Sequence, residues 1–133
     1  MSWTQKSRNG YLIATETLAL TTGQTTATDS SVIDFINPGV DFIIGTLPST
    51  ALSTTGVDVD IKVSDESAGT FGILKADLAT ADAKSLKYTT YDISANGQAP
   101  YYKVSLLPDG AMKSATVAVT VIVPPKIANA QYV

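Results

Sequence analysis

Two segments of the chain repeat their apolar residues with a period of two. In residues 57–64 four β-branched side chains alternate with four polar ones, a pattern that predicts a half-buried strand with one solvent-exposed face. A second run alternates Val117, Val119, Val121 and Val123 with residues that are themselves fairly apolar, Ile122 among them. Because both of its faces are apolar, we expect this strand to be deeply covered or to face a partner.

Less regular apolar runs predict further strands. They are Tyr11–Leu20, Val32–Ile36, Phe42–Leu47, Leu86–Ile93, Tyr101–Leu107 and a short one at Phe71–Ile73. Three compact turn signals, at residues 37–39, 96–97 and 108–110, favour hairpins. Leu74–Lys84 repeats apolar residues at helical spacing and predicts a short helix. The pattern is typical of an all-β, two-sheet β-sandwich with seven or eight strands and at most one short helix.

The ends of the chain differ from its middle. Residues 1–10 predict a polar N-terminal arm around Trp3, residues 11–123 the sandwich domain, and residues 124–133 a C-terminal tail that follows a double proline. Residues 21–31 predict a long polar loop. Trp3, Tyr132 and Val133 stand outside the predicted strands and gain little unless they dock, either on their own domain or on a neighbouring subunit. We count all three as candidate partner contacts, together with Ile122.

Composition narrows the chemistry of the chain. It holds no cysteine and no histidine, which excludes disulfides, thiolate chemistry and the usual proton shuttle at neutral pH. No apolar run is long enough for a signal-peptide core or a membrane span. The net charge is −3 and the lysines are dispersed, whereas a nucleic-acid-binding face needs clustered cations. We therefore expect neither membrane nor direct nucleic-acid contact.

The remaining polar residues offer one weak catalytic candidate. Asp58 and Asp60 lie on one strand face, roughly 7 Å apart, and two such carboxylates suit a calcium site or a metal-assisted hydrolase. The alternative interpretation is a solvated strand face, which we favour because no EF-hand spacing surrounds the pair. No Ser-x-x-Lys motif or phosphate-binding loop is present. The sequence predicts no enzyme, no metal and no cofactor.

The tyrosines divide between core and surface. Tyr102 shares a face with Val104 and Leu106 and is expected in the core, whereas Tyr101 is expected to be exposed. Exposed aromatics at Tyr101, Tyr91 and Trp3 would suit a carbohydrate- or receptor-binding module of a phage fibre or surface array, or a protein contact.

Three stretches of the sequence resemble a known family. Residues 18–35, with Ser31-Val32-Ile33-Asp34-Phe35, resemble the opening strand, Thr/Ala-rich loop and next strand of small jelly-roll cement (decoration) proteins of tailed-phage capsids, the family of the Bordetella phage cement protein. Residues 57–67 resemble that family's central strand with its acidic, Ser-containing turn. Residues 101–106 and 116–123 resemble its closing pair of strands.

The resemblance implies a jelly-roll-like sandwich and a structural function. Such proteins bind the outer surface of a phage head and stabilise contacts between capsomers, usually as small symmetric oligomers. It therefore implies the major capsid protein as partner, a homodimer or homotrimer, and a location on the outer capsid surface after synthesis in the host cytoplasm.

Overall fold

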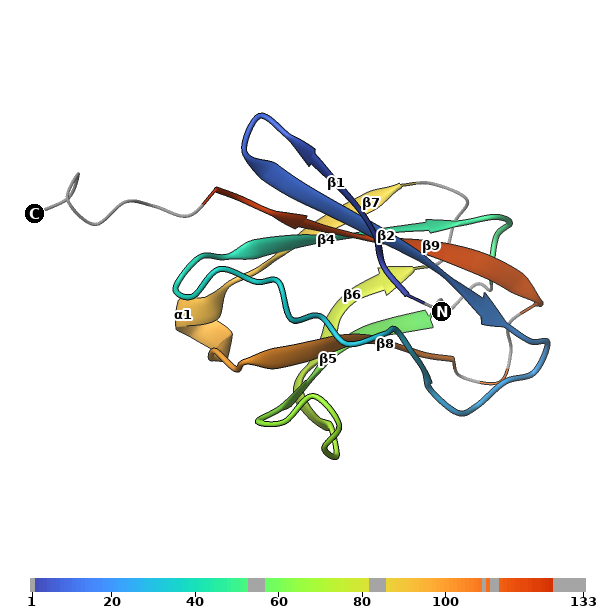
Figure 1. Ribbon diagram of the computed structural model, residues 1–133. Helices are drawn as coiled ribbons and strands as arrows, with labels where there is room; N and C mark the ends of the chain where they lie inside the picture. Colours follow the sequence, from blue (N-terminus) through green and yellow to red (C-terminus); the bar gives the residue numbers. More distant parts are fainter. Residues whose placement is uncertain (1, 53–56, 82–85, 109, 111–112, 126–133) are drawn as a thin grey trace, which may run out of the picture.

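Nine strands and one short helix make up the ordered elements in the computed structural model, which describes residues 2–52, 57–81, 86–108, 110 and 113–125 (Figure 1). The five-stranded sheet has the order β1-β2-β9-β4-β7 and the four-stranded sheet the order β3-β8-β5-β6, with every pairing antiparallel. The elements are β1 (Thr4–Arg8), β2 (Tyr11–Leu20), β3 (Thr28–Asp29), β4 (Phe42–Pro48), β5 (Val57–Ser64), β6 (Gly72–Ala81), β7 (Lys87–Tyr91), α1 (Ile93–Asn96), β8 (Tyr101–Leu107) and β9 (Ala115–Val123). The predicted all-β sandwich is confirmed. It has nine strands and not seven or eight, because β1 and β3 form in segments predicted as an arm and a loop, while the strand predicted at Val32–Ile36 is only a bridge at Ile33.

The connections between strands are those of a jelly roll. From β2 to β9 the chain crosses from one sheet to the other at every step except the β5–β6 hairpin. The three turn signals therefore do not form hairpins, and that prediction is wrong. The turn signals at residues 96–97 and 108–110 lie between strands of different sheets. The signal at residues 37–39 follows a stretch that forms no strand and in which only Ile33 makes a bridge, to Tyr102.

The helix forms at a different place from the predicted one. Residues 72–81 are β6, so the helix expected within Leu74–Lys84 is replaced by a strand as far as that segment is described. The helix is α1, which Asp92 caps by accepting hydrogen bonds from the backbone of Ser94 and Ala95. Gly97 ends it at φ 99°, so the Asn-Gly pair serves as a helix C-terminus and not as a hairpin turn.

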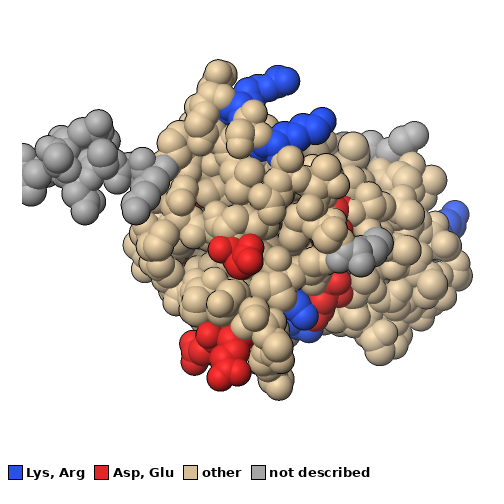
Figure 2. All heavy atoms as spheres, viewed as in Figure 1, with Lys and Arg blue, Asp and Glu red and all other residues tan. Residues whose placement is uncertain are grey.

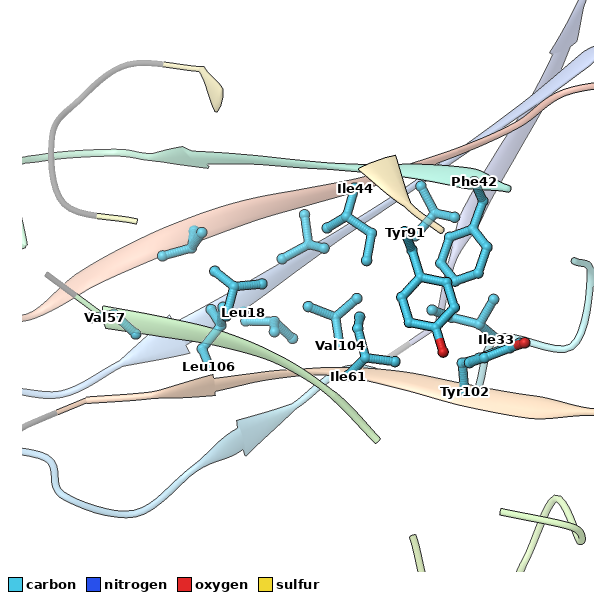
Figure 3. Packing of buried hydrophobic residues seen from close by; sticks show 14 of the residues in the cluster. Leu18, Ile33, Phe42, Ile44, Val57, Ile61, Tyr91, Tyr102, Val104 and Leu106 are labelled. Atoms are coloured by element: carbon cyan, nitrogen blue, oxygen red, sulfur yellow. The ribbon is translucent and has the colours of Figure 1, made fainter. Parts of the chain in front are cut away.

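The core lies between the two sheets and follows the predicted alternation. Val117, Val119, Val121 and Val123 are at most 2% exposed and face residues of the other sheet such as Val104 (Figure 3). At one end Phe42, Tyr91 and Tyr102 form an aromatic cluster with ring centroids 4.8 to 5.7 Å apart. Tyr102 is buried, as its alternation predicts.

The N-terminal arm is part of the five-stranded sheet. Thr4–Arg8 form β1, which pairs with β2 from Thr4 opposite Thr15 to Arg8 opposite Tyr11. All five β1 residues are exposed, and cationic side chains on an edge strand discourage uncontrolled pairing with other chains. The predicted loop at residues 21–31 likewise contains a short strand, β3.

Candidate interaction surface

The outer face of the five-stranded sheet is the most distinctive surface of the molecule. Because side chains alternate along each strand, pairing aligns the outward residues into rows across the sheet. One row is Lys6, Ile13, Ile122, Ile43 and Thr90, and the next is Thr4, Thr15, Thr120, Gly45 and Tyr88. We call this surface the outer face. Its two complete rows carry one charged side chain, that of Lys6.

Large hydrophobic side chains are exposed on this outer face. Of the six that the described residues expose, Tyr88 is 54%, Leu47 41% and Tyr11 42% exposed and point outward from β7, β4 and β2. Leu86, 48% exposed, directly precedes β7 and continues the alternation of Tyr88. Exposed apolar side chains gathered on one face mark a surface suited to protein contact.

Tyr88 takes its position from a glycine on the neighbouring strand. Gly45 lies directly opposite it, and a Cβ at position 45 would sit 2.5 and 2.7 Å from Tyr88 ring carbons. The edge of the Tyr88 ring therefore lies over the Gly45 backbone, so that Gly45 is buried although it is on the outer face. The glycine leaves room for an aromatic side chain that remains 54% exposed.

At its β1–β2 side, away from Tyr88, the outer face is hollowed. Over β1 and β2 an open depression of about 600 Å³ is lined by Ser2, Thr4, Lys6, Ile13, Thr15, Glu16 and Thr17. Most of these residues bear hydroxyl or methyl groups, and Lys6 and Glu16 are the charged residues of the lining. The outer face thus has an exposed aromatic side chain at β7 and a hollow at β1.

Of the predicted contact residues, Ile122 lies at the centre of this outer face and is half-buried between Ile13 and Ile43. Tyr101 begins β8 in the other sheet and is also half-buried. Tyr132 and Val133 lie outside the described residues.

Trp3 packs on its own domain. Its indole N–H donates to the Ser31 carbonyl at 3.1 Å, and its ring meets Phe35 edge-on with centroids 6.1 Å apart. Of the two outcomes left open for the N-terminal arm, the structure has docking on the same chain.

The expectation that Tyr91 is exposed is wrong. Its side chain is fully buried, stacks on Phe42, and donates its hydroxyl to the Gly97 carbonyl at 2.7 Å. Burial, with the nearby Tyr102 second, raises the pKa of the Tyr91 phenol to about 12. Because side chains alternate along β7, Tyr91 points inward and Tyr88 outward; an aromatic count alone does not fix this phase.

The outer side of the four-stranded sheet carries the acidic candidates. Asp60 is only 3% exposed and Asp58 half-buried, so they do not form the freely solvated face that we favoured. Beside them Asp29 accepts hydrogen bonds from the Ser105 hydroxyl at 2.7 Å and from the Lys62 amine at 3.0 Å. Among the described residues no three acidic side chains are grouped closely enough to hold a metal ion.

Sequence reasoning missed one buried carboxylate. Glu16 points inward from β2, is 4% exposed, and accepts a hydrogen bond from the Ser31 backbone N–H at 3.0 Å. Its other oxygen, Oε1, has no hydrogen-bond partner among the described residues. Since Trp3 holds the carbonyl of the same Ser31, both groups fix the loop before β4 against the five-stranded sheet.

Within the described part of the chain, no helix has the length and apolarity needed to cross a membrane. Comparison with protein-family models, with curated proteins and with solved structures finds no match for this chain.

Proposed function

We propose that this protein is a structural component that binds the outer surface of a phage capsid and stabilises contacts between capsomers. The observation that carries the proposal is the outer face, a broad sheet surface on a small jelly-roll domain, with exposed hydrophobic side chains and one charged side chain in its two complete rows. Such a surface suits a protein whose activity is to be held against other proteins. The sequence resemblance at residues 18–35, 57–67, 101–106 and 116–123 is what suggests the capsid as the assembly.

The energetic logic of this role needs no reactive group. A protein that binds the assembled shell and not its dissociated subunits stabilises the shell by mass action. Repetition of a modest contact over many identical sites multiplies the effect, particularly where a symmetric oligomer binds at several points.

The experiment is to mix purified protein with undecorated capsids of its source and to sediment them. We expect saturable co-sedimentation and a higher temperature of capsid disruption. Lys103→Glu is the control variant: it changes a charge on the opposite sheet, where Lys103 lies over the Phe71 ring, and should co-sediment as the natural chain does. Absence of co-sedimentation at saturating protein concentration would refute the proposal.

A carbohydrate- or receptor-binding module is the second candidate, and the exposed Tyr88 ring favours it because sugars stack on exposed aromatic side chains. A glycan array tests it, with Tyr88→Ala as the disruptive variant and Tyr101→Ala as the control. Binding that Tyr88→Ala abolishes supports this candidate, and an array without binding excludes the sugars that it displays.

A further inference from the structure

We propose that the outer face pairs with the same face of a second copy of this chain, about a twofold axis that runs parallel to β9. The proposal does not depend on the capsid function. The two compete for the outer face, because a dimer buries this face and a capsid would then have to bind the surfaces that the pairing leaves exposed. The pairing follows from the distribution of charge, of shape and of apolar side chains over the rows of the sheet. In charge, in shape and in the placing of apolar side chains, the β1 side of one copy complements the β7 side of the other.

Charge is divided between the two lateral edges of the sheet. Continuing the register one step beyond the Ile122 row aligns Arg8 and Tyr11 at one edge with Asp41 and Asp92 at the other. Both the β1–β2 turn and α1 lie toward the same end of the molecule (Figure 1), and basic side chains gather over the β1–β2 hairpin in Figure 2. The cations and the carboxylates thus lie at the same end but on opposite edges.

A twofold axis parallel to the strands exchanges the two edges. It places β1 of one copy over β7 of the other while keeping each row opposite itself. Arg8 then lies opposite Asp92 of the second copy, and Lys6 lies in the neighbouring row, one row away from the same carboxylates. Asp92 is ionised over the whole neutral range, because hydrogen bonds from the Ser94 hydroxyl and backbone lower the pKa of its carboxyl.

The same rotation matches shape. Tyr88 and Thr4 lie at opposite ends of one row, so the exposed Tyr88 ring of each copy lies opposite the hollow over Thr4 and Thr15 of the other. At the axis, Ile122 faces its own copy, and Ile13 faces Ile43. The contact is isologous, as a closed dimer requires.

The size of the face agrees with a small dimer. Five strands about 4.8 Å apart and about seven residues long, at about 3.3 Å each, cover roughly 550 Å² in projection. Stable complexes at the lower end of the standard range bury about 600 Å² per partner, and side-chain relief increases the projected figure. An axis running across the strands is disfavoured, because it stacks β1 on β1, gathers the cations of both copies and leaves both hollows unfilled.

Single cysteines locate the axis, because the natural chain has none. A residue on the axis faces itself across about 10 Å of packed side chains, so Thr120→Cys should give a covalent dimer with a thiol reagent of that span. Thr90→Cys, at the β7 edge, lies about 19 Å from its own copy across the sheet and should not. Asp34→Cys, exposed in the loop before β4, is the background control.

Charge substitution gives the solution test. Sedimentation velocity over a concentration series should show a dimer for the natural chain. Thr120→Glu sets two carboxylates opposite each other and should raise the dissociation constant about 100-fold or more, while Lys103→Glu leaves it unchanged. A monomer at every concentration overturns the proposal, and so does a dimer that Thr120→Glu leaves intact.

The test also separates this proposal from the capsid function. A natural chain that is monomeric, and whose binding to capsids Thr120→Glu abolishes, would assign the outer face to the shell and refute the dimer. A dimer that fails to bind capsids would refute the capsid function and leave the dimer standing.

Discussion

Trp3 ties the first strand of the chain to the rest of the domain, and removing its side chain tests how strongly. The indole contributes a hydrogen bond to Ser31, an edge-on contact with Phe35 and apolar burial against the core. The hydrogen bond is worth about 0.5–1.5 kcal/mol and the ring pair about as much. Roughly 100 Å² of apolar surface removed from water adds about 2.5 kcal/mol as an upper estimate.

These terms predict two different losses. Trp3→Phe removes the indole donor but keeps a ring beside Phe35, so the free energy of unfolding should fall by about 1 kcal/mol. Trp3→Ala removes all three contributions and should lower it by about 2–4 kcal/mol. The loss cannot exceed the free energy with which β1 docks on the rest of the domain, because beyond that point β1 detaches.

Urea unfolding followed by circular dichroism measures both losses, with exposed Gln5→Ala in the same strand as control. Trp3 is the only tryptophan, so its fluorescence in the natural chain reports whether β1 detaches before the sandwich unfolds. A Trp3→Ala variant within about 0.5 kcal/mol of the natural chain would show that the indole does not anchor the arm.

Three further predictions concern the core and both outer surfaces. The pKa of Tyr91 is about 12 in the fold against 10.0 unfolded, so its contribution to stability is complete below pH 10 and lost between pH 10 and 12. Tyrosinate absorbance during alkaline unfolding should show this loss, and Tyr91→Phe should weaken the dependence of stability on pH in that range. Asp29→Ala should cost about 1–3 kcal/mol in urea unfolding because buried Ser105 loses its acceptor, whereas an equal cost for Asp29→Asn would implicate the charge instead. Gly45→Ala should destabilise the natural chain by displacing the Tyr88 ring but be neutral or stabilising in a Tyr88→Ala background; additive effects in this double-mutant cycle would contradict the contact.

The alternation of apolar residues predicted the strands with the strongest pattern but not their partners. β5 and β9 follow directly from the period of two, because one buried face enforces that alternation. Turn residues misled, since Asn-Gly ends α1 as readily as it forms a hairpin, and only long-range pairing decides between the two. β1 has no apolar alternation at all; it is a strand because β2 offers it an edge.

The candidate surface was predictable only in part. The apolar second face of β9 pointed to Ile122, which does lie on the outer face. The other members come from strands distant in sequence, and Tyr88 stands out only because a glycine lies opposite it. The phase that buries Tyr91 and exposes Tyr88 depends on which sheet β7 joins, which is a tertiary choice.

The pairing of β2 with β9 has a consequence for how the chain acquires its structure. Leu12 lies opposite Val123 and Leu20 opposite Ala115, so the middle of the larger sheet joins segments that are far apart in the sequence. Closing such distant contacts is entropically costly, and folding of this topology is expected on a scale of milliseconds to seconds. During synthesis β2 cannot pair until β9 has also left the ribosome, and its inward apolar residues are unprotected until then. Accumulation of intact protein will therefore depend on how soon β9 becomes available for pairing.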